Sequence, residues 1–269
     1  MSQRFFSSAR IGGDRCVLEG SEAHHLARVM RAKPGTEVVL FDGSGAEFRA
    51  KIESVRRDRC ELQVLDRIEI DRELPRRLTI AAALPKGDRQ RWMVEKLVEL
   101  GVACFVPLQT RRGVARAGNH ANERLRRAVI EASKQCGRNR LMEISSPRPL
   151  EPFLQHDCSG EVRWLAHPRA MLPDHRPAAT NGSAFDTVDN LGERLARQST
   201  ATIVLAIGPE GGFDPQELRL SRAAGWRPLD LGPRVLRTET AAVTLAAIAA
   251  AWIDRTSSQG REQAVAGPS

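Results

Sequence analysis

The sequence predicts an α/β fold preceded by a smaller, mostly β domain, and three observations carry this prediction. Short apolar segments alternate with helical patterns from residue 78 onward, which is typical of a parallel sheet covered by helices on both faces. Residues 1–72 instead hold several strand patterns and one helical pattern. At 269 residues, the chain is long enough for two hydrophobic cores. We therefore expect domains at 1–72 and 73–254, with an unstructured tail at 255–269.

The first domain is expected to be a small β-barrel or β-sandwich with one helix. Asp42-Gly43, between two alternating segments, is a strong hairpin signal. Ser21 is the expected N-cap of the helix, whose opposite face presents Arg28 and Arg31. Strands are expected over residues 4–6, 15–18, 37–41, 47–55 and 61–68.

The second domain is expected to alternate strands and helices after a charged linker at 71–77. Asp214 as N-cap, Pro215 at the first helical position and Glu217 three residues after the cap form a capping-box signal. The Pro- and Gly-rich stretch 172–190 is expected to be an irregular connection. We expect strands over 78–84, 104–108, 162–166, 202–207 and 228–231, and helices over 91–100, 123–136 and 241–252.

Charge and cysteine content narrow the class of protein. Residues 73–150 carry a net charge of +9, against +1 for residues 1–72 and −2 for 151–269, which indicates a basic face for a polyanionic partner. Five scattered cysteines without a C-x-x-C pair indicate reduced thiols rather than a disulfide framework or a zinc site. The N-terminus resembles no signal peptide, and the apolar run at 241–252 is too short to span a bilayer. We expect a cytoplasmic protein with no metal and no membrane partner.

Two predicted strands each stop on Gly-Pro, at Gly208-Pro209 and at Gly232-Pro233. Ligands of parallel sheets bind beyond the carboxyl ends of the strands, and glycine lets the backbone approach a ligand. Neither turn is a phosphate-binding P-loop or a dinucleotide fingerprint. They predict a pocket walled by main chain, although each turn alone could be merely structural. Arg234 and Arg237, beside an apolar helix, need either a carboxylate such as Glu210 or Glu239 or an anionic ligand.

Three ordered motifs resemble those of the ribosomal RNA small subunit methyltransferase E family. They read HPRA at 167–170, IGPEGG at 207–212 and LGPRVLRTETA at 231–241. ELGV at 99–102, EA at 131–132 and QCGRNR at 135–140 agree with the same family. The resemblance runs from Arg4 to about Trp252, and the sequence departs from the pattern only in the 172–190 connection and the tail.

The resemblance implies both a fold and an activity. It implies an N-terminal PUA-like β-barrel that binds RNA, and a SPOUT-type α/β domain that ends in a trefoil knot and works as a homodimer. The implied reaction transfers a methyl group from S-adenosylmethionine to N3 of one uridine in 16S ribosomal RNA of the small subunit. Rival hypotheses are a SPOUT methyltransferase acting on transfer RNA or on a ribose hydroxyl, and a non-catalytic RNA-binding assembly factor.

The resemblance also implies roles for individual residues. Arg237 is the candidate for stabilising charge on the uracil oxygens, and Glu210 or Glu239 is the candidate base or the group that orients Arg237. The expected cofactor-binding residues are His167, Pro168, Ile207, Gly208, Gly211, Leu231, Gly232, Leu236, Arg237 and Thr238. The expected RNA-binding residues are Arg4, Arg28, Arg31, Lys86, Arg111, Arg112, Arg138 and Arg140.

Overall fold

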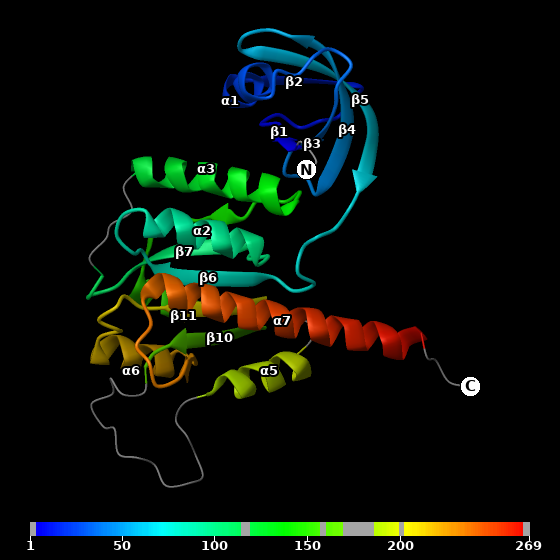
Figure 1. Cartoon of the computed structure of the whole chain (residues 1–269). Helices are drawn as coiled ribbons and strands as arrows, with labels where there is room; N and C mark the ends of the chain where they lie inside the picture. The colour runs from blue at the N-terminus through cyan, green and yellow to red at the C-terminus, as the bar shows by residue number, and fades with distance from the viewer. Residues whose placement is uncertain (1–3, 114–118, 157–159, 169–185, 199–201, 266–269) are drawn as a thin grey trace. The chain divides into compact units, whose positions relative to one another are not determined.

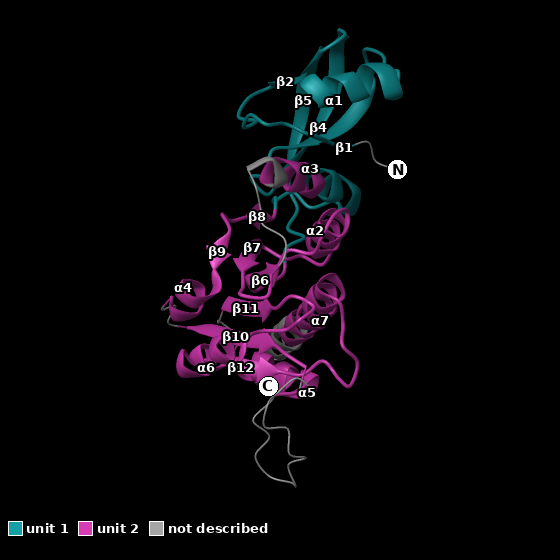
Figure 2. Ribbon diagram, turned by 90° about the vertical axis from the view of Figure 1, so that its left-hand side faces the viewer, with its two compact units in different colours: residues 1–73, 130–141 teal, residues 74–129, 142–269 magenta. Residues whose placement is uncertain are grey.

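The chain divides into two compact units, each described here by itself (Figure 2). The computed structural model describes residues 4–113, 119–156, 160–168, 186–198 and 202–265. One unit comprises residues 1–73 and 130–141, and the other comprises residues 74–129 and 142–269. The segment 130–141 thus joins the N-terminal unit, although the sequence pattern groups it with the second domain.

The larger unit is built on the expected parallel sheet (Figure 1). Its strand order is β12-β10-β11-β6-β7-β8, with β9 also paired to β7, and every recorded pairing is parallel. The central strands are almost wholly buried because helices cover both faces, which explains their continuous apolar sequences. The strands are β6 (Leu78–Ala83), β7 (Cys104–Gln109), β8 (Glu143–Ile144), β9 (Arg148–Pro149), β10 (Glu161–Ala166), β11 (Thr202–Ile207) and β12 (Arg227–Leu229).

Two groups of helices cover the sheet of the larger unit. On one face, side chains of α4 and α6 pack in a single cluster with residues of β6, β7, β10 and β11. Helix α7 contacts β6 and β11, and α2 and α5 pack against α7. The helices of this unit are α2 (Arg89–Glu99), α4 (Leu150–Gln155), α5 (Val188–Arg197), α6 (Pro215–Ala223) and α7 (Thr238–Val265). Helix α3 (Asn119–Cys136) begins in this unit, and its residues from 130 onward belong to the smaller unit.

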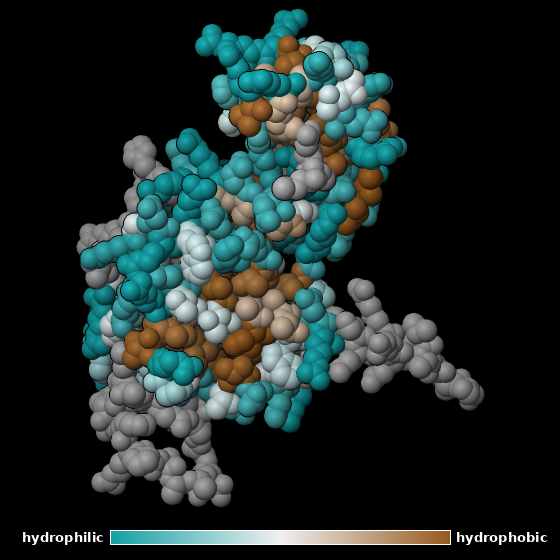
Figure 3. Space-filling model, viewed as in Figure 1, coloured by the Kyte–Doolittle hydropathy of each residue, from teal (hydrophilic) through white to brown (hydrophobic). Residues whose placement is uncertain are grey.

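Helix α7 is buried along one side and apolar along part of its open side. Ala242, Leu245 and Ala249 are fully or almost fully buried, whereas Val243 and Ile248 are only half-buried. Figure 3 shows apolar surface over this helix, on the face turned to the viewer. A helix that is apolar beyond its buried stripe leaves hydrophobic surface that another body could cover.

Several predicted bounds in the larger unit differ from the structure. The expected helix 241–252 continues to Val265, so residues 255–265 do not form the unstructured tail, and 266–269 lie outside the described residues. The stretch 172–190 lies outside the described residues up to 185, but α5 begins at Val188 behind a capping box in which Thr187 accepts from the Asn190 N–H. Helices α4 and α5 and strands β8 and β9 were not predicted; α4, β8 and β9 are short elements that carry little periodicity.

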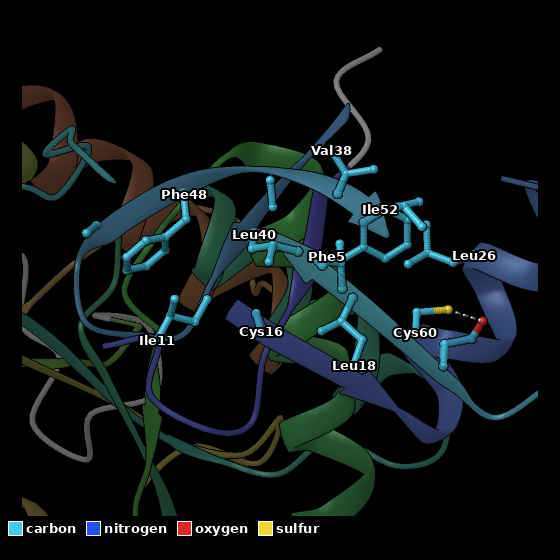
Figure 4. Close-up of a cluster of buried hydrophobic side chains, with 14 residues drawn as sticks. Phe5, Ile11, Cys16, Leu18, Leu26, Val38, Leu40, Phe48, Ile52 and Cys60 are labelled. Carbon is cyan, nitrogen blue, oxygen red and sulfur yellow. Dashed lines mark hydrogen bonds between the residues drawn. The ribbon is translucent and has the colours of Figure 1, made fainter. Parts of the chain in front are cut away.

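The smaller unit is a half-barrel sheet of five strands with the order β1-β3-β4-β5-β2. In β4, Phe48, Ala50 and Ile52 point into the core while the residues between them are exposed, as a half-buried strand requires. Figure 4 shows Phe48 and Ile52 in one cluster with Leu40 and Leu26. The expected hairpin at Asp42-Gly43 is confirmed by antiparallel pairing of β3 with β4. The strands are β1 (Arg4–Phe6), β2 (Arg15–Glu19), β3 (Glu37–Phe41), β4 (Ala46–Val55) and β5 (Arg59–Glu69).

The helical segment of the smaller unit begins two residues earlier than predicted and changes type. Helix α1 spans Gly20–His24 with Glu19, not Ser21, at the N-cap, and a π-helical turn, η1, follows over His25–Val29. A buried network holds the segment 130–141 in the same unit. Arg4 donates to the Glu47 carboxylate at 2.7 Å and to the carbonyl of Gly137 at 3.2 Å, and it also contacts Asn139.

The described cysteines are free thiols, and none of the described helices has the length and apolar character to cross a membrane. Burial raises the pKa values of the Cys16, Cys60 and Cys104 thiols above their usual value, despite weaker opposing contacts. Cys158 lies outside the described residues. These three buried thiols are therefore poor nucleophiles in the folded chain.

Candidate functional site

Three neighbouring strands end at the same edge of the larger unit's sheet. In the parallel register, Ala166 of β10 lies opposite both Ile207 of β11 and Leu229 of β12. The loops that leave these strands are therefore brought together, as expected for a ligand site in an α/β sheet. The two Gly-Pro turns and His167-Pro168, which lie far apart in sequence, form this edge.

These loops line a partly open pocket at the edge of the sheet. Its wall combines apolar side chains with main-chain groups and few charges, which suits a flat heterocycle recognised by backbone hydrogen bonds. It is lined by Ala166, His167, Pro168, Ile207, Gly208, Pro209, Glu210, Gly212, Asp230, Leu231, Gly232, Arg234, Val235, Leu236, Thr238 and Ala241.

The first Gly-Pro turn packs closely against the aromatic side chain of Phe213. A Cβ on Gly208 would lie 3.1 Å from the ring of buried Phe213, so a larger residue would disturb that packing. The centroids of the His167 and Phe213 rings lie 6.4 Å apart. The predicted capping box is confirmed, because Asp214 accepts from the Gln216 N–H and Glu217 accepts from the Asp214 N–H at 2.7 Å.

The second Gly-Pro turn is held by its own side chains. Asp230 accepts a hydrogen bond from the Gly232 N–H at 3.2 Å, and Gly232 has φ +104°, a conformation that L-residues rarely adopt. The predicted strand end at Leu231 is Leu229 in the structure. Thr238 is the first residue of α7, and its hydroxyl donates to the Gly208 carbonyl at 3.1 Å. This hydrogen bond joins the two turns.

A carboxylate beside the pocket is buried and only half satisfied. Glu239, in the first turn of α7, has a side chain that is 7% exposed. Arg89 Nη1 lies 3.3 Å from its Oε1 and 3.4 Å from Glu210 Oε1. Among the described residues Glu239 Oε2 is buried without a hydrogen-bond partner. A buried acceptor of this kind is costly unless a ligand or water completes it.

Most of the predicted cofactor residues line this pocket, but not all do. Gly211 and Arg237 are outside the lining, and Glu239 lies next to it. Arg237 is exposed, and the two glutamates proposed to orient it pair with Arg89 instead. Sequence reasoning did not name Ala166, Gly212, Asp230, Val235 and Ala241, which lie within or next to the recognised motifs. No local signal pointed to Arg89, which lies 121 residues from Glu210.

The predicted RNA-binding residues fall into three groups. Arg4 and Arg138 are buried, and they form ion pairs with Glu47 and Glu73 within the smaller unit. Arg111 is exposed but pairs with Glu151, and Arg112 donates to the Gly211 carbonyl at 2.7 Å. The remaining residues of the set are exposed, namely Arg28, Arg31, Lys86 and Arg140.

Comparison with known proteins defines first the class and then the family. Residues 72–250 match the RNA methyltransferase domain, and residues 18–65 match the RNA methyltransferase PUA domain. The chain therefore combines an RNA methyltransferase domain with a PUA domain. Among curated proteins, it is 33% identical to ribosomal RNA small subunit methyltransferase E of Synechocystis, over 84% of this chain and 69% of that protein. The Bacillus subtilis protein of the same name is 30% identical, over 83% and 85%.

Solved structures agree with the sequence relatives. A methyltransferase from Legionella pneumophila in complex with its bound cofactor SAM is 31% identical with a TM-score of 0.78, over 93% of this chain and 98% of that one. Ribosomal RNA small subunit methyltransferase E of Neisseria gonorrhoeae, bound to S-adenosyl methionine, is 28% identical with a TM-score of 0.75, over 92% and 96%. This chain belongs to the ribosomal RNA small subunit methyltransferase E family.

Proposed function

We propose that this chain transfers a methyl group from S-adenosylmethionine to N3 of a specific uridine in 16S ribosomal RNA. The observation that carries the proposal is the main-chain pocket at the ends of β10, β11 and β12, which lies inside the matched RNA methyltransferase domain. Relatives named ribosomal RNA small subunit methyltransferase E support the proposed substrate. Solved relatives that hold S-adenosylmethionine support the proposed cofactor.

The residues of the pocket fit S-adenosylmethionine. Ile207, Leu231, Leu236 and Ala241 give it an apolar wall for the adenine, and the backbone of both Gly-Pro turns offers hydrogen-bonding groups for the adenine edge and the ribose. The buried Glu239 Oε2, without a partner among the described residues, is an acceptor that a bound ligand could complete. When bound, S-adenosylmethionine supplies a methyl group on a positively charged sulfur, which keeps the electron pair of the broken carbon–sulfur bond.

The chain's own residues must activate uridine N3, which carries a proton at neutral pH. Glu239 accepts that proton in our proposal, because its carboxylate is fixed by Arg89 and has one free oxygen in a dry environment. Glu210 lines the pocket and is the alternative acceptor. Arg237, exposed at the start of α7, stabilises the negative charge that develops on the uracil oxygens. Holding N3 in line with the methyl group contributes most of the acceleration.

Both units carry positive charge suited to the RNA backbone. Arg28 and Arg31 are exposed beside the π-helical turn of the PUA domain, and Lys86 and Arg112 are exposed in the methyltransferase domain. Contacts between arginine or lysine and phosphate position a nucleic acid without reading its sequence. In our proposal the choice of uridine therefore depends on the shape of the RNA. An enzyme with this substrate acts in the cytoplasm, where ribosomal subunits are found.

We propose that the active form is a homodimer, because α7 leaves apolar surface uncovered. In α7, Val243, Ala247 and Ile248 are half-buried and Ala251 is exposed. Figure 3 shows apolar surface, in brown, over this helix. Helix α2, which packs against α7, adds Trp92 with 45% exposure. A second copy of this chain would bury these groups. Sedimentation velocity should give twice the mass of one chain, and a monomer at micromolar concentration would contradict the proposal.

Replacing Arg237 with alanine separates chemistry from cofactor binding. We expect Arg237→Ala to abolish methylation of 16S RNA because the uracil anion loses its counter-charge, while calorimetric affinity for S-adenosylmethionine changes little. Unchanged turnover would remove Arg237 from the mechanism. If the unaltered chain binds no S-adenosylmethionine, the non-catalytic assembly-factor hypothesis is favoured instead; if it methylates a ribose hydroxyl or transfer RNA, the proposed substrate is wrong.

A further inference from the structure

Arg89 is placed against the electrostatics of its own helix. It is the first residue of α2, where the helix dipole and the unpaired N–H groups make a cation unfavourable, and the first turn of α2 contains no acidic residue. Helix propensity therefore does not explain a positive charge at this position. The explanation lies in residues from distant parts of the chain, because Glu210 of the first Gly-Pro turn and Glu239 of the first turn of α7 both contact the Arg89 guanidinium.

The partner carboxylate in α7 needs this charge. Glu239 is buried, and Arg89 provides its recorded ion pair. An ionised carboxylate in such a place is strongly unfavourable without a counter-charge. Arg89 is itself more than one-third exposed, so it keeps part of its hydration while it reaches inward. Only one carboxylate oxygen of Glu239 is used, which leaves the other oriented but unpaired among the described residues.

The start of α2 is a rigid support for this contact. Next to Arg89, the Gln90 side chain is buried and donates to the Pro85 carbonyl at 2.7 Å, which ties the helix start to the loop that follows β6. Helix α2 also packs against α7. Arg89 Nη1 thus lies between two pocket elements, the first Gly-Pro turn through Glu210 and the first turn of α7 through Glu239.

We propose that Arg89 is a positioning residue of the methyl-transfer site, which compensates the buried charge of Glu239 and fixes both Glu239 and Glu210 before ligands bind. The assignment of a role in catalysis rests on the proposed function. The charge compensation does not, because it concerns contacts within this chain. Arg89 acts through the two glutamates and need not touch the cofactor or the uridine.

Four variants test this role: Arg89→Ala, Arg89→Lys, Glu239→Gln and the double variant Arg89→Ala/Glu239→Gln. Arg89→Ala should lower kcat for methylation roughly tenfold to a hundredfold, as expected for a misplaced catalytic group. It should change the KM for RNA and the calorimetric affinity for S-adenosylmethionine by less than about threefold. Arg89→Lys should recover most of the lost rate, because an ammonium also compensates the carboxylate.

Thermal unfolding without any ligand gives an independent readout. Arg89→Ala should lower the melting temperature because it leaves a buried charge alone, and adding Glu239→Gln should restore part of the loss by removing that charge. Arg197→Ala, which alters an exposed helical arginine paired with Glu193, is the matched control and should leave kcat unchanged. Wild-type kcat in Arg89→Ala, or a double variant no more stable than Arg89→Ala, would overturn the proposal.

If the unaltered chain fails to methylate uridine N3 while the double variant still regains stability, the charge compensation holds and the proposed function fails. If methylation occurs as proposed but neither kcat nor stability responds as described, only the role of Arg89 is wrong. The two conclusions are therefore tested separately.

Discussion

At the scale of single residues, the burial and partners of an arginine decide its role more than its position in a motif. Arg4 and Arg138 belong to segments that resemble the family's motifs, yet both are buried with carboxylates of the smaller unit. No sequence motif indicated a role for Arg89, but it forms ion pairs with two glutamates at the pocket. Sequence alone does not distinguish these cases, because an ion pair between residues far apart in the chain leaves no local pattern.

The ion pair of Arg4 with Glu47 predicts how the smaller unit responds to acid. Burial alone would raise the pKa of Glu47, but hydrogen bonds and charges from Arg4 and Arg72 outweigh it, so the pKa lies below its ordinary value of 4.5. A depressed pKa gives stability that is complete above the unfolded value and is lost as pH falls through the folded value. The smaller unit should therefore lose this stabilisation below about pH 4.5.

Glu47→Gln should cost about 1–3 kcal/mol of unfolding free energy near neutral pH, because the two arginines lose their charged acceptor. Urea unfolding of the wild type and of the variant should show this difference shrinking as pH falls below about 4.5. Glu37→Gln, at an exposed position of β3, is the control and should have little effect. A difference that stays constant down to about pH 3 would show that the ionised form of Glu47 is not what stabilises the unit.

At the scale of elements, the packing of α5 against α7 depends on one glycine that helix propensity would reject. A Cβ on Gly192, in the middle of α5, would lie 2.2 Å from Cε2 of Trp252 in α7. No backbone reason requires glycine there, since Gly192 is not among the residues with positive φ in the described chain. The close approach of the two helices is therefore the reason for this glycine.

For Gly192→Ala, the sign of the change in the free energy of unfolding tests this packing. In an exposed helix, alanine in place of glycine stabilises by about 1 kcal/mol, but here we expect a loss of about 1–3 kcal/mol because the ring of Trp252 must move. Urea unfolding measures the change, and Gly12→Ala, where a Cβ would meet nothing within 4 Å, serves as the control. A more stable Gly192→Ala variant would show that α5 does not pack on α7 in this way.

The sequence predicted two kinds of feature well: strands that are buried on both faces, and helix starts that depend only on neighbouring residues. The central strands of the parallel sheet are buried on both faces, and the capping box at Asp214 depends only on neighbouring residues. Helix α5 was missed because its capping box pairs Thr187 with Asn190, a weaker signal inside a Pro- and Gly-rich stretch. The true length of α7 was missed because its apolar pattern stops at Trp252, whereas its C-terminal part is polar.

At the scale of the whole molecule, the site was predictable in outline but not in its contacts. Two strands ending on Gly-Pro predicted a main-chain pocket, and the pocket lies at that edge of the sheet. The sheet order, which places β10 between β11 and β12, brings His167 into it. The charged contacts were not predictable, because Arg89 meets its partners only through tertiary structure. The trefoil knot and the position of the general base remain predictions.

The central claim is that this chain methylates N3 of a uridine in 16S ribosomal RNA. The most direct measurement is nucleoside mass spectrometry of 16S ribosomal RNA from a strain that lacks this chain, compared with the same strain carrying the intact gene. We predict that 3-methyluridine is absent from one site in the deletion strain and returns on complementation. Unchanged 3-methyluridine in the deletion strain, or loss of a ribose methyl group instead, would contradict the account.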